Sequence, residues 1–173
     1  MVGLLTLLYL FSKCYETDPS TKRVEAMQYM GSKSRIAKQI IPIMVADAKA
    51  NSITFWVEPF IGGGNLIDKV PSTFKRLGSD LNPHVVAALT AIRDKVKDLP
   101  KSLTEQEYNR IKGTPPEPIT SWQRFVCSFG SKFEGGYARR KGSNDTTFSK
   151  AAVMNAEKQS PLLKNVVIIR GGV

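Results

Sequence analysis

Three consecutive glycines, and an aspartate 18 residues after the first of them, are the residues with the clearest chemical use. Gly62-Gly63-Gly64 follow the apolar run 53–57, which is typical of a buried strand, and Asp80 ends a second strand candidate that begins at residue 76. Glycines let the chain turn tightly after a strand and leave the amides of a following helix open to a polar ligand. A carboxylate at this distance is placed to accept hydrogen bonds from ribose hydroxyls. The pattern therefore predicts a site for a nucleoside-containing cofactor.

The same residues permit a purely structural interpretation. A dinucleotide site would require a further glycine at position 67, where this chain has Ile67, so a pyrophosphate ligand is disfavoured. An adenosyl ligand without phosphates still fits the spacing. Alternatively, the glycines form a turn between core elements and Asp80 only caps the next helix. Spacing alone leaves both interpretations open.

Helical periodicity on both sides of these residues predicts the elements that position them. We expect a helix over 34–50, kinked at Pro42, and a short helix from Asn65. A further helix is expected to begin with Asn82 as its cap and Pro83 as its first residue, and to end at Pro100. The apolar faces of the two longer helices comprise Ile36, Ile40, Ile41, Met44 and Val45 in the first and Val85, Leu89, Ile92, Val96 and Leu99 in the second.

From residue 101 onward the pattern changes. Thr104 and Glu107 fit a capping box for a short helix closed by Gly113. A stiff, proline-rich loop, 114–118, follows that helix. The apolar stripe of another helix is expected to comprise Trp122, Phe125, Val126 and Phe129.

The C-terminal part of the sequence holds a glycine-rich basic loop over 135–145 and a strand over 165–169. Strands that alternate with helices, interrupted by an inserted segment, indicate an α/β layered fold. Only three strands are visible, so the predicted sheet is incomplete.

The charge of the chain points to a polyanionic partner or an anionic surface. The formal net charge is +10 and the sequence pI is about 9.7. Residues 100–173 carry 12 Lys and Arg against 6 Asp and Glu, whereas residues 1–99 carry 13 against 9. A DNA-contacting region would therefore be expected in the second half. A basic protein with an ordinary solvated face is the alternative.

Several classes of protein are disfavoured. Cys14 and Cys127 have neither metal-ligand nor disulfide-framework spacing, which predicts free thiols in a reducing, cytoplasmic compartment. The single histidine, His84, argues against a histidine-based metal site, and no metal is expected. The apolar run 2–11 is too short to span a bilayer and lacks the basic flank of a signal peptide, so no membrane partner is expected.

Three motifs in order resemble the Dam-type (D12 class) DNA adenine-N6 methyltransferases. Tyr29-Met30-Gly31-Ser32-Lys33 is similar to the N-terminal Y-x-G-x-K motif of that family. Phe60-Ile61-Gly62-Gly63-Gly64, preceded by Glu58-Pro59, matches its F-x-G-x-G cofactor motif. Ser79-Asp80-Leu81-Asn82 resembles the following motif, which carries the acid for the ribose. The resemblance covers about 27–171, more weakly from 122 to 150.

The resemblance implies S-adenosylmethionine as cofactor and double-stranded DNA as partner. It places the backbone of the F-x-G-x-G motif against the methionine end of the cofactor and Asp80 against its ribose, with Tyr29 and Lys33 closing over the site. The residues that it implies for the cofactor are Tyr29, Lys33, Glu58, Pro59, Phe60, Ile61, Gly62, Gly63, Gly64 and Asp80. Those that it implies for DNA are Arg124, Lys132, Tyr137, Arg139, Arg140, Lys141 and Asn144, with phosphate contacts favoured over base contacts.

The fold implied by this resemblance is a Rossmann-like S-adenosylmethionine-dependent methyltransferase fold. The sheet is incomplete, and a mainly helical target-recognition lobe is inserted into it. We expect an N-terminal extension and linker over 1–26, a cofactor-binding α/β part over 27–99, the recognition lobe over 100–164, and a strand that returns to the sheet over 165–173.

The family's Asp-Pro-Pro-Tyr motif, which holds the amino group of a flipped-out adenine, does not occur in these 173 residues. Pro115-Pro116 are flanked by Thr114 and Glu117 and do not follow a strand. We therefore assign no catalytic residue, and expect weak cofactor binding and no methyl transfer by this chain alone. A truncated product, one half of a split enzyme, and a non-catalytic module that binds DNA or protein as a decoy or inhibitor all remain open. An incomplete sheet leaves an open edge, so we also expect association with a second copy or a complementary C-terminal fragment.

Overall fold

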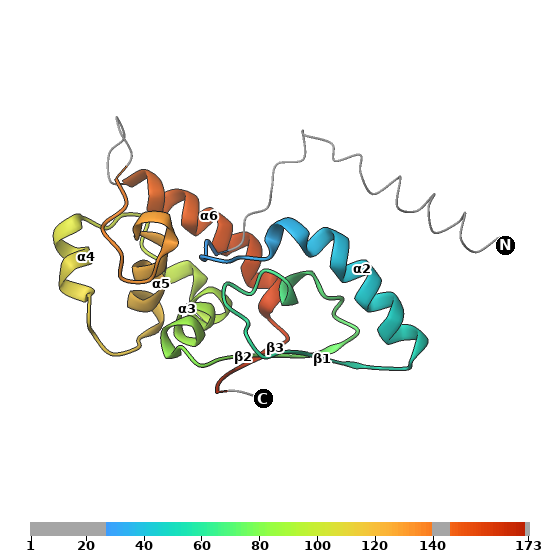
Figure 1. Cartoon of the computed structure of the whole chain (residues 1–173). Coiled ribbons are helices and arrows are strands. Elements are labelled where there is room, and N and C mark those ends of the chain that lie inside the picture. The colour runs from blue at the N-terminus through green and yellow to red at the C-terminus, as the bar shows by residue number, and fades with distance from the viewer. Residues whose placement is uncertain (1–26, 140–145, 172–173) are drawn as a thin grey trace.

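A computed structural model describes residues 27–139 and 146–171, and its centre is a small parallel sheet (Figure 1). The strands β1 (Phe55–Glu58), β2 (Lys75–Asp80) and β3 (Val166–Arg170) are hydrogen-bonded in the order β1-β2-β3. Both pairs are parallel, and the register places Val57 beside Leu77 and Leu77 beside Val167. The predicted mixed α/β architecture with three strands is confirmed.

The carboxyl ends of these parallel strands lie at one edge of the sheet. There β1 ends at Glu58, immediately before the glycine turn, and β2 ends at Asp80. In α/β sheets this edge is where ligands bind. The topology alone therefore brings the two predicted cofactor motifs together.

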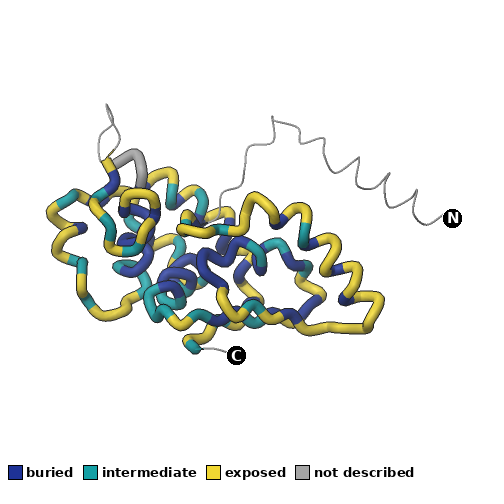
Figure 2. Tube along the Cα trace, in the orientation of Figure 1, coloured by how far each residue is buried: buried dark blue, intermediate teal, exposed yellow. Residues whose placement is uncertain are grey.

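Helix α2 (Ser34–Ala50) has the predicted bounds and continues through Pro42. Its buried face, however, differs from the predicted one: Ile36 and Met44 are exposed. The buried residues follow a spacing of three or four and include two alanines, which a search for large apolar side chains overlooks. They are Ala37, Ile41, Val45 and Ala48. Figure 2 shows the exposed outer side of this helix.

Helix α3 (Pro83–Asp94) begins as predicted. The Asn82 side chain accepts a hydrogen bond from the His84 amide at 3.0 Å, and Pro83 occupies the first turn. The predicted end at Pro100 is wrong, because the helix ends at Asp94 and a 3₁₀ turn, η2 (Val96–Asp98), follows. A second 3₁₀ turn, η1 (Ile67–Lys69), takes the place of the short helix expected from Asn65.

The helical region after α3 contains α4 (Glu105–Ile111), α5 (Pro118–Val126) and the 3₁₀ turn η3 (Phe129–Ser131). The capping box of α4 is confirmed, since Thr104 and Glu107 each hydrogen-bond the backbone amide of the other. The prediction that Phe129 lies on the apolar stripe of α5 is wrong. It belongs to η3, is 72% exposed, and lies where backbone bonds join Phe129 to Gly136 and Ala138 to Cys127.

Helix α6 (Thr146–Leu163) was not predicted. It packs against α3, η1, η2 and α5 and leads directly into β3. Arg76 of β2 holds its end, because one guanidinium nitrogen donates to the carbonyls of Ile67, Val70 and Leu162. This contact ties the sheet, η1 and α6 together.

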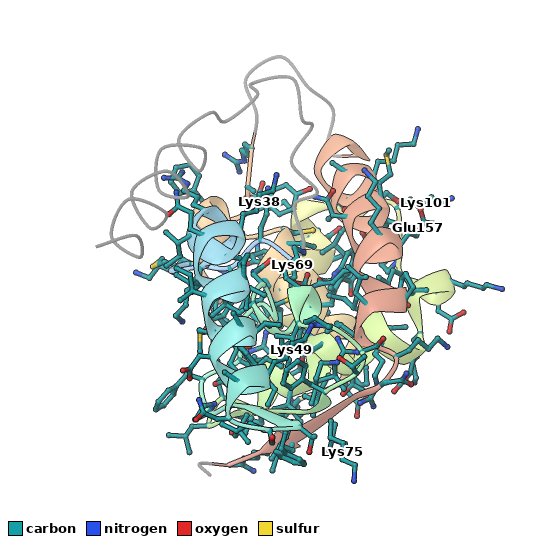
Figure 3. All side chains as sticks on the ribbon, turned by 90° about the vertical axis from the view of Figure 1, so that its right-hand side faces the viewer. Lys38, Lys49, Lys69, Lys75, Lys101 and Glu157 are labelled. Carbon is teal, nitrogen blue, oxygen red and sulfur yellow. The ribbon has the colours of Figure 1, made fainter. Side chains whose placement is uncertain are left out.

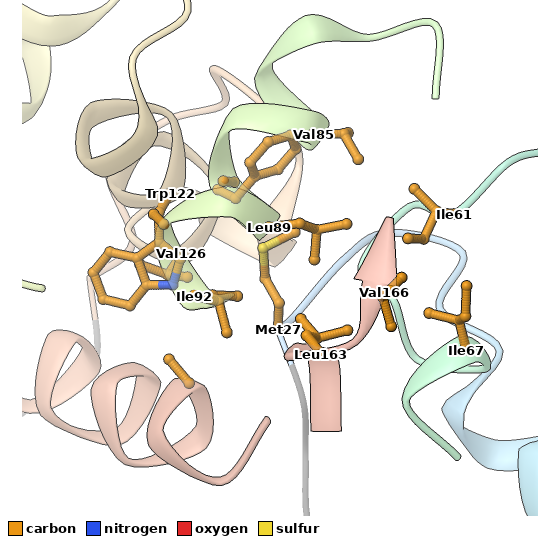
Figure 4. Packing of buried hydrophobic residues seen from close by; sticks show 14 of the residues in the cluster. Met27, Ile61, Ile67, Val85, Leu89, Ile92, Trp122, Val126, Leu163 and Val166 are labelled. Carbon is orange, nitrogen blue, oxygen red and sulfur yellow. The ribbon is translucent and has the colours of Figure 1, made fainter. Parts of the chain in front are cut away.

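The core lies between the sheet and the helices on one side of it. Figure 4 shows Met27, Leu89, Leu163 and Val166 gathered in this core, with Trp122 and Val126 of α5 beside them. Large side chains from α3 and α5 fill the rest, and Trp122, Phe125, Leu89 and Ile92 are all buried. The helical region is thus packed onto α3 through a shared apolar interface.

The opposite face of the sheet carries exposed apolar side chains. Phe55 and Val57 of β1 and Val167 and Ile169 of β3 are all at least two-fifths exposed. Among residues 27–139 and 146–171, no helix covers this face (Figures 1 and 2). Parallel sheets are normally covered on both faces, so this face is an unpartnered apolar surface. No helix among the same described residues is long and apolar enough to cross a membrane.

Candidate functional site

The loop that follows β1 is tied to β2 by its backbone. The Ile61 amide donates to the Ser79 carbonyl at 2.9 Å, and the Ser79 hydroxyl donates to the Pro59 carbonyl at 3.2 Å. Gly78 permits this approach, because a Cβ there would lie 2.2 Å from the Ile61 side chain. The loop is therefore held over the end of the sheet before the glycines begin.

Two of the three glycines adopt left-handed backbone conformations that disfavour other residues. The φ angle is +49° at Gly62 and +68° at Gly64. Gly62 also lies beneath the ring of Tyr29, where a Cβ would be only 2.9 Å from the ring carbon Cε1. A Cβ at Gly63 would lie 2.5 Å from the Asn65 amide nitrogen and 2.9 Å from the Met27 carbonyl. The turn is thus packed directly against the N-terminal motif.

Asp80 connects this turn to the start of α3. One carboxylate oxygen accepts from the Gly62 amide at 3.1 Å and the other accepts from the Asn82 amide at 3.0 Å. The cap of α3 is Asn82, so Asp80 is more than a helix-capping acid. A carboxylate has about four acceptor positions, which leaves capacity for the hydroxyls of a bound ribose.

A cavity of about 220 Å³ lies beside the turn and brings together most of the predicted cofactor residues. Its lining residues are Tyr29, Gly31, Ser32, Lys33, Glu58, Phe60, Ile61, Gly62, Gly63, Asn65, Leu66 and Asp80. Pro59 and Gly64 do not line it and serve the loop conformation instead. A second cavity of about 500 Å³ shares Tyr29, Gly31, Ser32 and Asn65 and reaches Gly130 and Ser131 of η3.

The electrostatics of the first cavity centre on Glu58. Burial raises its pKa to about 7, although a hydrogen bond of 3.0 Å from the Ile67 amide and the nearby Lys33 both act to lower it. Burial, with a smaller contribution from Asp80, also raises the pKa of Tyr29. A carboxyl group that titrates near neutral pH and faces a cavity is typical of a functional site.

These residues fit an adenosyl methyl donor in chemical terms. Gly62 and Gly63 bring main-chain atoms to the cavity wall, Asp80 offers an acceptor for diol hydroxyls, and Glu58 offers a counter-charge for a cationic ligand. The exposed ring of Phe60 borders the cavity. The volume is below the roughly 300–1,000 Å³ of common small-molecule sites, so such a ligand would extend beyond the cavity.

The predicted DNA-contacting residues other than Arg124 divide into three groups. Lys132 is exposed, and Arg139 is exposed while pairing with Glu105. Tyr137 has a structural role in addition, because its hydroxyl donates to the Leu103 carbonyl at 2.5 Å and its ring packs on Tyr108. Arg140, Lys141 and Asn144 lie outside the described residues.

Arg124 is not available to DNA, so its assignment to the DNA-contacting set is corrected. Its side chain is only 2% exposed and forms an ion pair with Glu134. It also donates to the Thr114 carbonyl at 2.8 Å, and the guanidinium carbon lies 4.6 Å from the centre of the Phe133 ring. Burial, followed by the nearby Arg124, lowers the pKa of His84, which favours the neutral ring beside the guanidinium. Arg124 therefore holds α5, the loop after α4 and the segment after η3 together.

Replacing Arg124 by methionine is expected to lower the free energy of unfolding by about 2–3 kcal/mol. The change leaves the Thr114 carbonyl and the Glu134 carboxylate without their buried partner. Denaturant unfolding measures the loss. Arg110→Met, at an exposed position of α4, is the matched control and is expected to change stability by no more than about 0.5 kcal/mol. Equal effects of the two substitutions would contradict the assigned role.

Two buried amide side chains at the turn were missed from the sequence. Asn65 donates to the Met27 carbonyl at 3.2 Å, and Gln159 of α6 donates to the Gly63 carbonyl at 2.9 Å. Neither belongs to a recognisable motif, and Gln159 is almost 100 residues away along the chain. Within the described part of the chain, no group of three His, Cys, Asp or Glu side chains is arranged to hold a metal ion.

Comparison with known families agrees with this geometry. A family model described as D12 class N6 adenine-specific DNA methyltransferase matches residues 29–117, more than half of the chain. The matched segment contains the Tyr29 motif, the glycine turn and Asp80, which line one cavity. Comparison with curated proteins finds no match. The family expected from the three sequence motifs is therefore confirmed, and the chain belongs to the D12 class N6 adenine-specific DNA methyltransferases.

Proposed function

We propose that this chain supplies the S-adenosylmethionine-binding and DNA-recognition parts of a DNA adenine-N6 methyltransferase. The observation that carries the proposal is the single cavity lined by the N-terminal motif, the glycine turn, Glu58 and Asp80. Each of these lies within the segment that the family model matches. In this proposal 27–99 and the returning β3 form a Rossmann-like cofactor part, and 100–164 form an inserted recognition lobe.

The proposed binding mode assigns each group a separate task. Asp80 accepts hydrogen bonds from the ribose hydroxyls. Glu58 and the backbone of the glycine turn face the charged methionine end, while Tyr29 and Lys33 border the same cavity. When bound, S-adenosylmethionine supplies an electrophilic methyl group on a sulfonium. Contacts to these groups would hold the donor in one orientation, and such positioning contributes to the rate.

The acceptor side of the reaction requires groups that we do not find in this sequence. The lone pair of adenine N6 is delocalised into the ring, so oxygen acceptors must hold both amino hydrogens before nitrogen attacks carbon, and an aromatic face must stack on the extruded base. The Asp-Pro-Pro-Tyr motif that serves this purpose in the family is not among the 173 residues. We propose that transfer depends on a segment or partner that provides it.

Strand β1 is where such a segment would join the sheet. Within the part of the chain that the structure describes, β1 pairs with β2 alone, and its Phe55 and Val57 side chains are exposed. A parallel strand added at this edge would end beside Glu58 and Phe60, next to the cavity. The same edge would accept a second copy of the chain, which is the alternative occupant.

The proposed DNA surface lies on the basic second half of the chain. Lys132 and Arg139 are exposed there, and the sequence adds Arg140, Lys141 and Asn144. Phe129 is exposed three residues before Lys132 and offers an apolar face of the kind that stacks on bases. Phosphate contacts from the cationic residues would make binding steeply dependent on salt.

The proposal predicts that calorimetry will detect S-adenosylmethionine binding and that Asp80→Asn will weaken it at least tenfold. The asparagine keeps the size of the side chain but loses the charge and one acceptor oxygen that the diol would use. Asp98→Asn, at an exposed position after α3, is the matched control and is expected to bind like the wild type. Absence of cofactor heat from a folded wild type, together with salt-sensitive DNA binding, would favour a non-catalytic DNA-binding module instead.

A further inference from the structure

Gln159 is fully buried, and within the described residues its amide bonds both to Met27, which lines the second cavity, and to Gly63, which lines the cofactor cavity. Its carbonyl oxygen accepts from the Met27 amide at 3.0 Å. Its nitrogen donates to the Gly63 carbonyl at 2.9 Å and approaches the Asp68 carboxylate at 3.4 Å. The side chain therefore uses its acceptor and both of its donors, and the two backbone partners fix the orientation of the amide.

These contacts join two segments that are distant in sequence and that pack against each other beside the cavity. Met27 is held at its amide by Gln159 and at its carbonyl by Asn65. Two residues later, Tyr29 lies over Gly62, at the spacing that leaves no room for a Cβ. A shift of Met27 would therefore also shift the Tyr29 ring, and a shift of Gly63 would displace the backbone of the glycine turn.

Helix α6 fixes where Gln159 sits. Arg76 donates to the Leu162 carbonyl, three residues beyond Gln159, at 3.0 Å. Glu157, in contrast, lies on the outer surface of α6 (Figure 3). The helix begins at Thr146, directly after the sequence that holds Arg140, Lys141 and Asn144. One helix therefore connects that basic segment to the glycine turn.

We propose that Gln159 is a positioning residue for the cofactor, which clamps the N-terminal motif onto the glycine turn through Met27 and Gly63. It touches no reacting atom, and its effect passes through the Tyr29 ring and the Gly63 carbonyl. The inference rests on the proposed cofactor function for its consequence, while the clamp itself is a property of the free protein. It also makes the shape of the cavity depend on α6, which lies outside the segment that the family model matches.

The test compares Gln159→Leu and Gln159→Glu with Ser160→Ala. Leucine removes all three hydrogen bonds at similar volume. Glutamate retains an acceptor for the Met27 amide but places a second carboxylate beside Asp68. Ser160→Ala removes a part-buried hydrogen bond, from the neighbouring residue of the same helix to the Arg93 carbonyl at 3.4 Å, that does not reach the turn. Cofactor affinity is measured by calorimetry well below each unfolding midpoint, and exchange of the Met27 amide proton is followed by NMR in the absence of cofactor.

Both Gln159 variants are expected to bind S-adenosylmethionine at least tenfold more weakly than the wild type, and Ser160→Ala within about twofold of it, tenfold being about 1.4 kcal/mol. Exchange of the Met27 amide is expected to be at least tenfold faster in Gln159→Leu and unchanged in Ser160→Ala. In the wild-type protein, saturating cofactor is expected to slow exchange of the Met27 amide further. This measurement can be made without any variant.

Each outcome decides a separate statement. Unchanged Met27 exchange in a folded Gln159→Leu protein would overturn the clamp, whether or not the cofactor binds. Faster exchange with unaltered affinity would overturn the positioning role. An unprotected Met27 amide in the wild type would overturn the clamp even if the variants do not fold. A wild type that binds no cofactor would contradict the proposed function instead, and the exchange data alone would then judge the clamp.

Discussion

Replacing Gly62 by valine is expected to weaken S-adenosylmethionine binding about a hundredfold, equivalent to about 2.7 kcal/mol. Two costs combine. The φ angle of +49° lies in the left-handed region, which costs a side chain with a Cβ about 1–2 kcal/mol and disfavours β-branched residues most. The new Cβ would also meet the Tyr29 ring at 2.9 Å, so the ring must leave the cavity wall. Calorimetric titration of the folded variant measures the loss.

Gly136→Val provides the matched control for this substitution. Gly136 lies after η3, has open space around its Cβ position and is exposed. We expect its cofactor affinity to stay within about twofold of the wild type and its unfolding free energy to change by less than about 0.5 kcal/mol. If Gly62→Val bound the cofactor as well as Gly136→Val does, the cavity beside the glycine turn would not be the cofactor site.

The strands and the site around them followed from sequence because their signals are local. Short runs of β-branched or aromatic residues predicted β1 and β3, and the glycines after β1 with the acid that ends β2 predicted which strand ends would meet. The Asn82–Pro83 start of α3 and the Thr104–Glu107 box depend on neighbouring residues alone. Features of this kind can be predicted from sequence because they do not depend on how the rest of the chain packs.

Helix α6 was missed because half of its buried side is polar. Ser149, Gln159 and Ser160 are all buried on it, between small apolar residues such as Ala156. A search for recurring large hydrophobic residues passes over such a face. Gln159 became recognisable only when the fold placed it beside Gly63, because its partners are contributed by three separate segments.

The burial of a charged side chain caused the other wrong prediction from the sequence. Arg124 was assigned to DNA because arginine in a basic region usually faces solvent or phosphate. Its burial depends on Glu134, Thr114 and Phe133, which converge on it only after α5 packs on α3. Arg76 is buried in the same way by three carbonyl groups. The composition gives the total charge of the chain. Which charged side chains are buried depends on the hydrogen-bond and ion-pair partners that the fold brings next to them.

The raised pKa of Glu58 sets opposite pH dependences for stability and for cofactor affinity. Because burial raises its pKa to about 7 in the folded protein, the native state holds this proton more strongly than the unfolded chain does. The stabilisation is therefore complete below the unfolded pKa, near 4.5, and is lost as the pH rises to about 7. A cationic cofactor, in contrast, prefers the ionised carboxylate and must displace the proton at low pH.

We therefore expect the affinity for S-adenosylmethionine to rise with pH, by up to about tenfold per pH unit below 7, and to level off above it. Glu58→Gln keeps the acceptor for the Ile67 amide but cannot ionise, so its profile should be flat and its affinity at pH 8 at least tenfold below that of the wild type. The same variant should unfold at higher denaturant concentration than the wild type at pH 8, where the buried charge is removed, and near the wild-type value at pH 4.5. Calorimetry across pH 5.5–8.5 and denaturant titrations at pH 4.5 and 8 test both signs. A wild-type affinity independent of pH would place the positive charge of the donor away from Glu58. A cation close to that carboxyl would favour its ionised form, so binding below pH 7 would have to release the proton.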